Sequence, residues 1–374
     1  MESINKAKNW LLNSNVQQKN GEHIGAFNSW YDNEQKNFTF AYPEITGYAL
    51  TLLTYLYSLE KNPIYLQKAK QAAEWIIKKV VDQDGGCFSC FPYLSSFNKN
   101  QGIKYVFDSG MILNGIVNLY REVPDNRYLN SSIKIAEWLQ DMQQKDGSFI
   151  PFIDKDGIKK QKLETWSTQS GSYLSKVSIG LLNLYDITRN NEIKNMATKS
   201  LNNALSFQKS DGRFKTYNNY NSSNFHPHCY SAEAMLTAGL FLEIKDYLNS
   251  ATNATKYILE NLSLDDEVPR HYMENKFNYN ERSDIIAQVL RLAVLLKYLG
   301  LLESSKEIQK IYNRLLLYQE KTNGHEGSFV FGKRSDGSIA NNANSWCTMF
   351  ALQALILHNN ILTNKLEFNW RYLV

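Results

Sequence analysis

The chain has 374 residues, of which 43% are hydrophobic and 21% charged, and its formal net charge is +4. This composition is typical of a globular protein with a large core, and a small positive charge without a dense basic cluster argues against nucleic-acid binding. The apolar runs are shorter than the roughly 18 residues that a membrane-spanning helix needs. We therefore expect no nucleic-acid partner and no membrane-spanning segment.

The cysteines and the first residues indicate a compartment. The stretch from Met1 to Trp10 lacks the apolar core of a signal peptide. Four cysteines in a chain of this length do not suggest a disulfide framework. Cys87 and Cys90 have C-x-x-C spacing, but no second pair completes a zinc site. We expect a cytoplasmic protein with reduced thiols, no metal and no cofactor; the oligomeric state is unknown.

Two kinds of helix are predicted to alternate along the chain. Amphipathic helices are expected over residues 3–14, 63–81, 127–143, 191–208, 247–262 and 303–320. Each precedes a mostly apolar helix, and the apolar helices begin near Glu44, Asp108, Tyr173, His228, Arg282 and Asn344, between 54 and 65 residues apart. A helix that is apolar all round is a buried one. The period therefore predicts six helical hairpins.

A recurring turn separates the two helices of each pair. It reads Gln143-Gln-Lys-Asp-Gly-Ser-Phe149 in the third repeat, and related forms begin at Gln17, Asp82, Gln208 and Asn323. Asp-Gly favours a tight turn because glycine tolerates positive φ, and the following aromatic begins a short extended piece. The fifth repeat, from Ser263 to Arg270, lacks the glycine. We expect short β-hairpins at one rim of the fold.

Six such pairs have a natural packing, with the apolar helices in an inner ring and the amphipathic helices around it. This architecture resembles the (α/α)6-toroid superfamily of carbohydrate-active proteins over essentially the whole chain. Three motifs resemble more closely an uncharacterised toroid family associated with bacterial surface-polysaccharide biosynthesis: Tyr42-Pro-Glu-Ile-Thr-Gly-Tyr48, Phe107-Asp-Ser-Gly110 and Trp346-Cys-Thr-Met-Phe350. The resemblance implies an all-α fold, one toroid domain over residues 1–374 and no strand longer than a hairpin arm. Related toroids include unsaturated glucuronyl hydrolases, polysaccharide lyases and sugar epimerases.

Polar residues gather at the predicted starts of the apolar helices, which would share one rim with the hairpins. We expect Glu44, Asp108 and His228 to be catalytic. The expected substrate-binding residues are Tyr48, Tyr173, Lys176, His226, Tyr230, Arg282, Asp284, Asn344 and Trp346. Helix N-termini favour carboxylate and neutral imidazole at such positions. Structural alternatives exist: Asp108 could be a helix cap, and Arg282 could simply pair with Asp284.

Several functions remain open at this point. A glycosidase needs two carboxyl groups that flank the scissile bond, which Glu44, Asp108 and Asp284 could supply. A uronic-acid lyase or C5-epimerase needs a base such as His228 or Tyr230, and a cation such as Arg282, with Asn344, for the developing enolate. A 2-epimerase would use paired histidines on opposite sugar faces, and His226 and His228 are too near each other for that.

Other classes are less well supported by the sequence. The Gln-x-Asp-Gly-x-Phe turns are similar to those of terpene cyclases, and a lanthionine-cyclase-like zinc site would need Cys229, Cys347 and one of the two neighbouring histidines. A non-catalytic glycan-binding toroid is a third alternative. We favour a hydrolytic enzyme in surface-polysaccharide metabolism whose partner is an anionic or acetamido-containing oligo- or polysaccharide.

Overall fold

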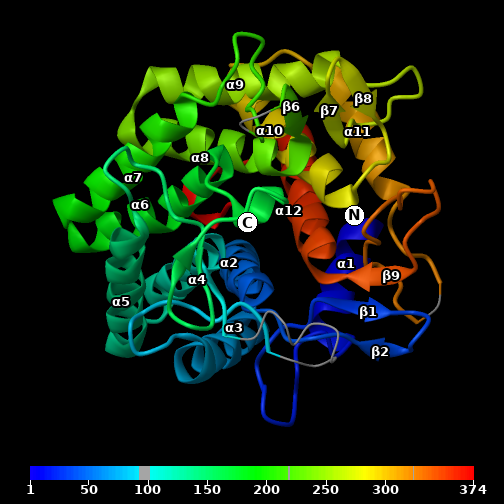
Figure 1. Cartoon of the computed structure of the whole chain (residues 1–374). Helices are drawn as coiled ribbons and strands as arrows, with labels where there is room; N and C mark the ends of the chain where they lie inside the picture. The colour runs from blue at the N-terminus through cyan, green and yellow to red at the C-terminus, as the bar shows by residue number, and fades with distance from the viewer. Residues whose placement is uncertain (92–101, 218–219, 323) are drawn as a thin grey trace. The chain divides into compact units, whose positions relative to one another are not determined.

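The computed structural model describes residues 1–91, 102–217, 220–322 and 324–374 (Figure 1). Helices dominate, and each strand in these ranges has only two or three residues. The predicted all-α class, with strands no longer than hairpin arms, is therefore confirmed. Backbone contacts group the helices into two compact units.

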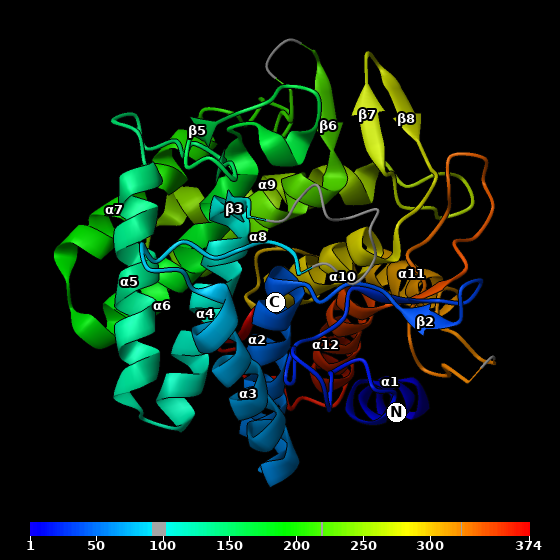
Figure 2. The ribbon, with the colours of Figure 1, turned by 60° about the horizontal axis from the view of Figure 1, so that its bottom comes forward.

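The α2–α7 unit comprises Gln17–Ser29, Thr39–Ser206 and Trp370–Val374. Its apolar helices lie side by side, with α4 in contact with both others (Figure 2). An amphipathic helix packs on each apolar helix that it follows in sequence. The apolar helices are α2 (Pro43–Glu60), α4 (Val106–Glu122) and α6 (Val177–Thr188), and the amphipathic helices are α3 (Pro63–Trp75), α5 (Asn126–Met142) and α7 (Asn191–Leu205).

Short irregular helices complete this unit. A π-helical turn, η1 (Ile76–Val80), continues α3, and 3-10 turns occupy η3 (Trp166–Thr168) and η5 (Trp370–Tyr372). The third apolar helix differs from the prediction, because a 3-10 turn, η4 (Ser172–Lys176), precedes α6. Tyr173 and Lys176 therefore lie in a tighter helical turn before the α-helix, whereas an α-helical first turn was expected.

The α8–α12 unit comprises Met1–Val16, Trp30–Phe38 and Phe207–Asn369. Here α9 packs on α8, α11 packs on α10, and α1 takes the corresponding place on α12. The apolar helices are α8 (Phe225–Leu242), α10 (Ser283–Tyr298) and α12 (Ser345–Leu362), and the amphipathic helices are α1 (Glu2–Asn13), α9 (Lys245–Glu260) and α11 (Ser305–Leu316). Within the described ranges of the chain, no helix is both long and apolar enough to cross a lipid bilayer.

Burial follows the two sequence patterns. In α10, every residue from Ser283 to Leu296 is buried. In α5, Ile135 and Trp138 are buried on one side, whereas Lys134 and Glu137 are exposed on the other. Helices of the first kind form the core and those of the second kind cover it, as the hydrophobic periodicity predicts.

Three small antiparallel sheets hold the starts of the apolar helices. In each sheet, the strand just before an apolar helix pairs with a strand from a different repeat, in the registers Tyr105↔Phe152, Asn224↔His271 and Asn344↔Trp30. The strand orders are β2-β1-β9, β3-β4-β5 and β6-β7-β8. The strands are β1 (Trp30–Asp32), β2 (Asn37–Phe38), β3 (Lys104–Tyr105), β4 (Phe152–Ile153), β5 (Lys159–Lys160), β6 (Ser222–Asn224), β7 (His271–Met273), β8 (Lys276–Asn278) and β9 (Asn342–Asn344).

The repeated glutamine of the turn motif ties four of the hairpins to an amphipathic helix. The Nε2 of Gln143 donates to the carbonyl oxygens of Gly147 in its own turn, at 3.2 Å, and of Met196 in α7, at 2.9 Å. Gly147 has a φ of +86°, which a side chain would strain. The same two-way contact is made by Gln17, Gln208 and Gln319. The repeated sequence signature thus encodes a specific contact between repeats.

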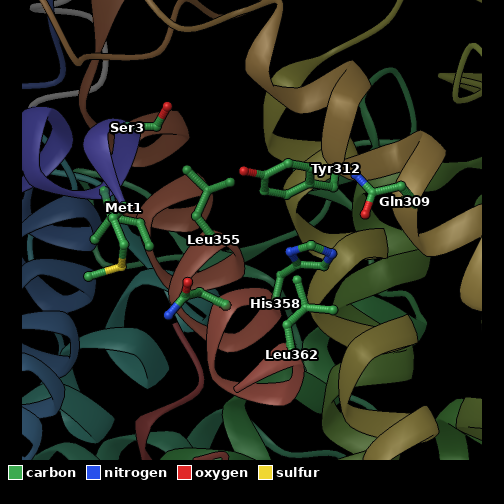
Figure 3. A pocket seen from close by; sticks show the side chains of 9 residues that line it. Met1, Ser3, Gln309, Tyr312, Leu355, His358 and Leu362 are labelled. Carbon is green, nitrogen blue, oxygen red and sulfur yellow. The ribbon is translucent and has the colours of Figure 1, made fainter. Parts of the chain in front are cut away.

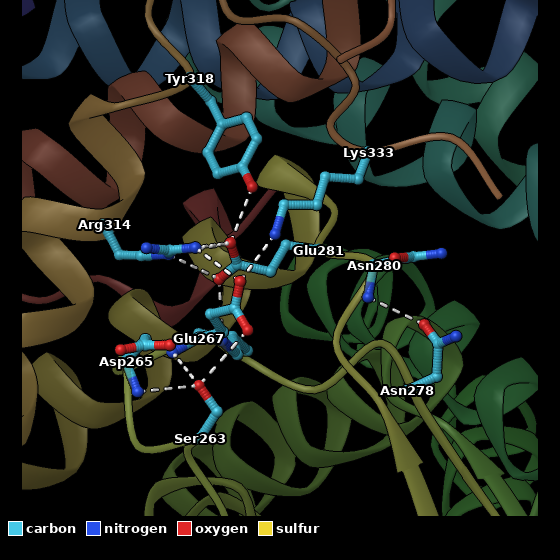
Figure 4. Close-up of polar contacts among 10 residues, drawn as sticks. Ser263, Asp265, Glu267, Asn278, Asn280, Glu281, Arg314, Tyr318 and Lys333 are labelled. Carbon is cyan, nitrogen blue, oxygen red and sulfur yellow. Dashed lines mark hydrogen bonds and ion pairs between the residues drawn. The ribbon is translucent and has the colours of Figure 1, made fainter. Parts of the chain in front are cut away.

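An ion-pair network replaces this contact in the fifth repeat, which lacks the glycine turn (Figure 4). Glu281 is fully buried and accepts hydrogen bonds from the Arg314 guanidinium of α11, from the Tyr318 hydroxyl at 2.7 Å and from the Val268 N–H at 2.8 Å. Glu267 accepts from Arg314 at 3.0 Å and from Lys333 at 2.7 Å. An arginine of α11 therefore fixes this loop, whereas a glutamine fixes four of the others.

That residues 1–374 form one domain stays a prediction. If they do, heating should give a single cooperative transition whose calorimetric enthalpy equals the van't Hoff enthalpy. Differential scanning calorimetry is the direct measurement. Two resolved transitions, one for each compact unit, would contradict the single-domain prediction.

Candidate active site

A side chain in the first turn of most apolar helices holds the hairpin that precedes it. In α2, the Thr46 hydroxyl accepts from the Phe27 N–H at 3.0 Å and donates to the Tyr42 carbonyl at 2.9 Å. The fourth residues of α4 and α12, Ser109 and Thr348, make the same pair of contacts. This position is structural in each of these helices.

His228 occupies the same position in α8. Its Nδ1 accepts from the Phe214 N–H at 3.0 Å, and its Nε2 donates to the Ala254 carbonyl at 3.0 Å. The ring is 1% exposed, and burial lowers its pKa to about 4. Because main-chain groups use both ring nitrogens, these contacts argue against the catalytic role that the sequence suggested. The structure assigns His228 to the hairpin contact.

The other two residues predicted to be catalytic, Glu44 and Asp108, lie in the first turns of neighbouring helices. A Cβ added at Gly47 of α2 would lie 2.8 Å from the Ile112 nitrogen of α4, and one at Gly115 would lie 2.6 Å from the Gly47 oxygen. Two glycines thus let the helix backbones touch about one turn beyond the acids. Glu44 and Asp108 are brought together by this close packing.

The electrostatics of the two carboxyl groups are linked. Asp108 is 4% exposed, and its Oδ2 has no hydrogen-bond partner in the described part of the chain. Burial, and then the charge of Glu44, raise the pKa of Asp108 well above its ordinary value. Asp108 does not cap α4, which has Tyr105 at its N-cap and no capping side chain. The cap alternative is therefore wrong.

Glu44 is better able to carry a negative charge than Asp108. Burial raises its pKa, but hydrogen bonds from the Tyr42 and Tyr48 hydroxyls and the positive charge of Lys176 act in the opposite direction. Asp108 has only a main-chain hydrogen bond to lower its pKa. Two nearby carboxyl groups that differ in this way do not ionise together. The first proton lost from the pair therefore comes mainly from Glu44, and Asp108 stays protonated until the pair loses its second proton.

Two further residues of this unit have internal partners. The buried Lys176 ammonium donates to the main-chain oxygen of Val374 at 2.9 Å. The Tyr173 hydroxyl lies 3.1 Å and 3.2 Å from the carbonyl oxygens of Ser167 and Gln169. These contacts favour roles in shaping the surroundings of the acids rather than direct substrate binding. Tyr42, which the sequence analysis did not select, supports Glu44 directly.

A second polar cluster, in the α8–α12 unit, centres on Asp284. This fully buried carboxylate accepts from Arg282 through both oxygens, at 3.0 and 2.5 Å, and from the Trp346 indole at 3.0 Å. The charges of Arg282 and His226 and these hydrogen bonds overcome the effect of burial and hold the pKa of Asp284 at about 2. The predicted pairing of Arg282 with Asp284 is present.

His226 belongs to this second cluster. Its Nδ1 lies 2.8 Å from the Gln288 Oε1 and 3.6 Å from the Asp284 Oδ2, and its ring packs against Tyr230 with centroids 4.5 Å apart. Gln288, one turn after Asp284, was not selected from the sequence, although the four-residue spacing could have indicated it. The Nε2 of Gln288 is buried and has no partner among the described residues.

Asn344 has a capping role. Its side chain accepts from the Cys347 N–H at 3.0 Å and thereby caps α12.

The residues that a zinc site would require are not gathered, because in the ranges that the structure describes no three His, Cys, Asp or Glu side chains are grouped as metal ligands.

Comparisons with known proteins were made in sequence and in structure. The model of the family described as Glycosyl hydrolase family 76 matches residues 49–255, more than half of the chain. Asp108 lies inside this range, and Glu44 lies just before it. No curated protein matches the chain in sequence.

Solved structures resemble the chain over nearly its whole length. The cellobiose 2-epimerase of Bacillus thermoamylovorans is 14% identical, with a TM-score of 0.79 over 96% of this chain and 100% of that one. The cellobiose 2-epimerase of Spirochaeta thermophila is 12% identical, with a TM-score of 0.74 over 96% and 98%. The unsaturated glucuronyl hydrolase of Bacillus sp. GL1 is 13% identical, with a TM-score of 0.68 over 96% and 98%. At these identities the likeness shows the fold, which is an (α/α)6 toroid.

The hairpin role of His228 predicts how its replacement will behave. His228→Ala should lower the free energy of unfolding by about 2–4 kcal/mol, because the Phe214 N–H and Ala254 carbonyl lose their partners and a cavity opens. Turnover per folded molecule should fall less than ~10-fold, because a general acid or base supplies more than that. Chemical denaturation and steady-state kinetics measure the two effects. A fully stable variant with turnover lost would restore the catalytic assignment.

Proposed function

The chain belongs to glycosyl hydrolase family 76. From this premise we propose that Asp108 and Glu44 are the two carboxyl groups that catalyse hydrolysis of a glycosidic bond in the substrate. The protein is a carbohydrate-active enzyme. The observation that carries the assignment is the difference between the surroundings of the two acids, whose pKa values are both raised by burial. The neighbouring charge of Glu44 further favours the protonated form of Asp108, whereas two tyrosines and a lysine oppose the effect of burial at Glu44.

The proposed mechanism follows from these protonation states. Asp108 donates its proton to the leaving oxygen of the glycosidic bond, as a general acid with a raised pKa does. Glu44 supplies negative charge at the anomeric carbon, either by direct attack or by activating water. Tyr42 and Tyr48 orient the Glu44 carboxylate through their hydroxyls. The Oδ2 of Asp108 has no partner among the described residues, so it can receive the substrate oxygen without first breaking a contact with one of them.

The lyase or C5-epimerase alternative is less well supported. It assigned the proton abstraction to His228 or Tyr230, and main-chain groups occupy both nitrogens of His228. Arg282, its proposed enolate stabiliser, is already paired through two hydrogen bonds with Asp284. Hydrolysis is therefore the reaction that we propose.

The positive charges around the Asp284 cluster support the proposal that the substrate carries an anionic group. Arg282 and Arg270 both lie against Phe331, with their guanidinium carbons 4.6 and 5.9 Å from the ring centroid. Burial, and then the charge of Arg282, lower the pKa of Arg270, and the charge of Asp284 opposes these two effects. Two arginines with one such carboxylate leave an excess of positive charge, which favours a carboxylated sugar over an acetamido sugar.

The biological setting is a further proposal. We place the enzyme in surface-polysaccharide biosynthesis because of the motifs that contain Glu44, Asp108 and Trp346. A cytoplasmic location is supported by the four cysteines, all of which are buried and outside disulfide bonds. A reducing compartment is compatible with thiols such as Cys87 and Cys90, which have not formed a disulfide.

Replacing each carboxyl group with its amide tests the assignment. Asp108→Asn and Glu44→Gln should each lower turnover at least ~100-fold, the usual scale for losing a general acid or base. Asp108→Asn should keep or raise stability at neutral pH. The unfolded Asp108 carboxyl ionises above about pH 4, whereas burial resists its ionisation in the folded protein, so wild-type stability falls as pH rises through the folded pKa and the amide removes this fall.

Hydrolysis of oligosaccharides that contain uronic acids, followed by chromatography of the products, measures turnover, and urea denaturation between pH 4 and 8 measures stability. Asp186→Asn is unsuitable as a control because this residue binds three arginines. Asp156→Asn, at an exposed turn, is the matched control. Near-normal turnover in Asp108→Asn would overturn the proposal.

The arginine pair predicts a preference that depends on substrate charge. Arg270→Gln should raise the KM for an oligosaccharide that contains uronic acid by ~10-fold, about 1.4 kcal/mol of lost binding, and leave the KM for a matched neutral oligosaccharide unchanged. Kinetics with both substrates give the comparison. Arg189→Gln, a largely exposed arginine at the end of α6, is the control. An equal change for both substrates would remove the support for an anionic substrate.

A further inference from the structure

A cavity of about 190 Å³ lies among α1, α11 and α12 (Figure 3). Leu355 and His358 of α12 are buried in its lining, whereas Gln309 of α11 and Leu362 of α12 are exposed. A lining that combines buried and exposed residues indicates a cavity with a buried floor and an opening to solvent. Its volume would hold roughly six waters at the density of the liquid.

His358 is the unusual group on the floor of this cavity. Its ring is 3% exposed and stacks on Tyr312, with centroids 4.2 Å apart and planes at 17°. Neither ring nitrogen has a hydrogen-bond partner in the chain as far as the structure describes it. The ring therefore lines the cavity with polar atoms that water or a ligand can bind.

The rest of the lining has a definite chemistry. The hydroxyls of Ser3 and Tyr312 and the side-chain amide of Asn359 likewise have no hydrogen-bond partner among the described residues. Leu355 and Leu362 supply an apolar wall, and the residues that line the cavity in the described part of the chain include no acidic or basic side chain. Burial and the charge of Lys297 lower the pKa of His358, so the ring is neutral at physiological pH. The cavity therefore suits an uncharged ligand with both polar and apolar faces.

We propose that this cavity is an accessory binding site for one uncharged sugar ring. Sugar hydroxyls would pair with His358, Tyr312, Ser3 and Asn359, and the C–H face of the ring would lie against the two leucines. The volume matches a single ring rather than an oligosaccharide. The cavity shares no residue with the Glu44–Asp108 pair, so the accessory site does not depend on the proposed hydrolysis.

NMR of the full chain tests this directly, because the chain has only six histidines. The imidazole signal of His358 is assigned as the one missing in His358→Phe. Titration with methyl glucoside, methyl mannoside or methyl galactoside should shift this signal saturably with at least one of them, and glucuronate should not shift it. Tyr312→Phe keeps the ring stack, removes one hydroxyl, and should weaken the binding at least fivefold. Tyr298→Phe, an exposed tyrosine at the end of α10, is the matched control and should not change it.

The titration is repeated in Asp108→Asn, where binding to the cavity should be unchanged even though turnover is lost. A His358 signal that none of the three glycosides shifts would show a cavity that holds water only and would overturn the proposal. Equal affinity in wild type and Tyr312→Phe would do the same. Loss of hydrolysis without any change at His358 would bear on the catalytic assignment alone.

Discussion

The hydrogen bond between a side chain in the first turn of an apolar helix and a main-chain N–H of the preceding hairpin is the contact on which the arrangement of polar residues depends. Thr46, Ser109, Thr348 and His228 each accept one such bond. Each of these hydrogen bonds fixes the rotation of its helix about the helix axis relative to the preceding hairpin. Neighbouring residues in the same turn, among them Glu44 and Asp108, are thereby placed by a contact that takes no part in the chemistry.

The chemistry that we propose depends on burial. Asp108 is buried in the first turn of α4, and further along this helix Gly47 and Gly115 allow the backbones of α2 and α4 to approach closely. Desolvation alone would raise the pKa of both acids, so the difference between them comes from the partners of Glu44. The Asp284 cluster shows the opposite outcome at similar burial, because Arg282 makes ionisation favourable there. The same residue type thus acts as an acid or as an anion according to its neighbours.

Much of the fold could be predicted from the sequence, because its signals are long and periodic. The alternation of helix types, the Asp-Gly turns and the all-α class came from repeats that span the whole chain, and Glu44 and Asp108 were found because they lie at the starts of apolar helices. The small sheets could not be found, since strands of two or three residues that pair distant loops, such as β1 with β9, have no periodicity to detect.

Some candidate site residues have structural contacts that the sequence could not indicate. A histidine that bonds main-chain groups and one that faces a substrate look identical in sequence, so His228 was expected to be catalytic although Thr46 and Thr348 hold the equivalent positions. Lys176 finds its partner 198 residues further along the chain, at Val374, and no local pattern indicates such a contact. Arg270 and His358 were missed because packing with distant elements, rather than local spacing, gives them their roles.

The central claim is that Asp108 holds a proton at neutral pH because it is buried beside the charge of Glu44. Infrared difference spectroscopy of the protonated carboxyl stretch, with Asp108→Asn to assign the band, measures this directly. The account predicts a band from protonated Asp108 at pH 7 in the wild type, and a lower pKa for this group in Glu44→Gln, where the neighbouring charge is absent. An Asp108 carboxyl that titrates near pH 4 in both proteins would contradict the account.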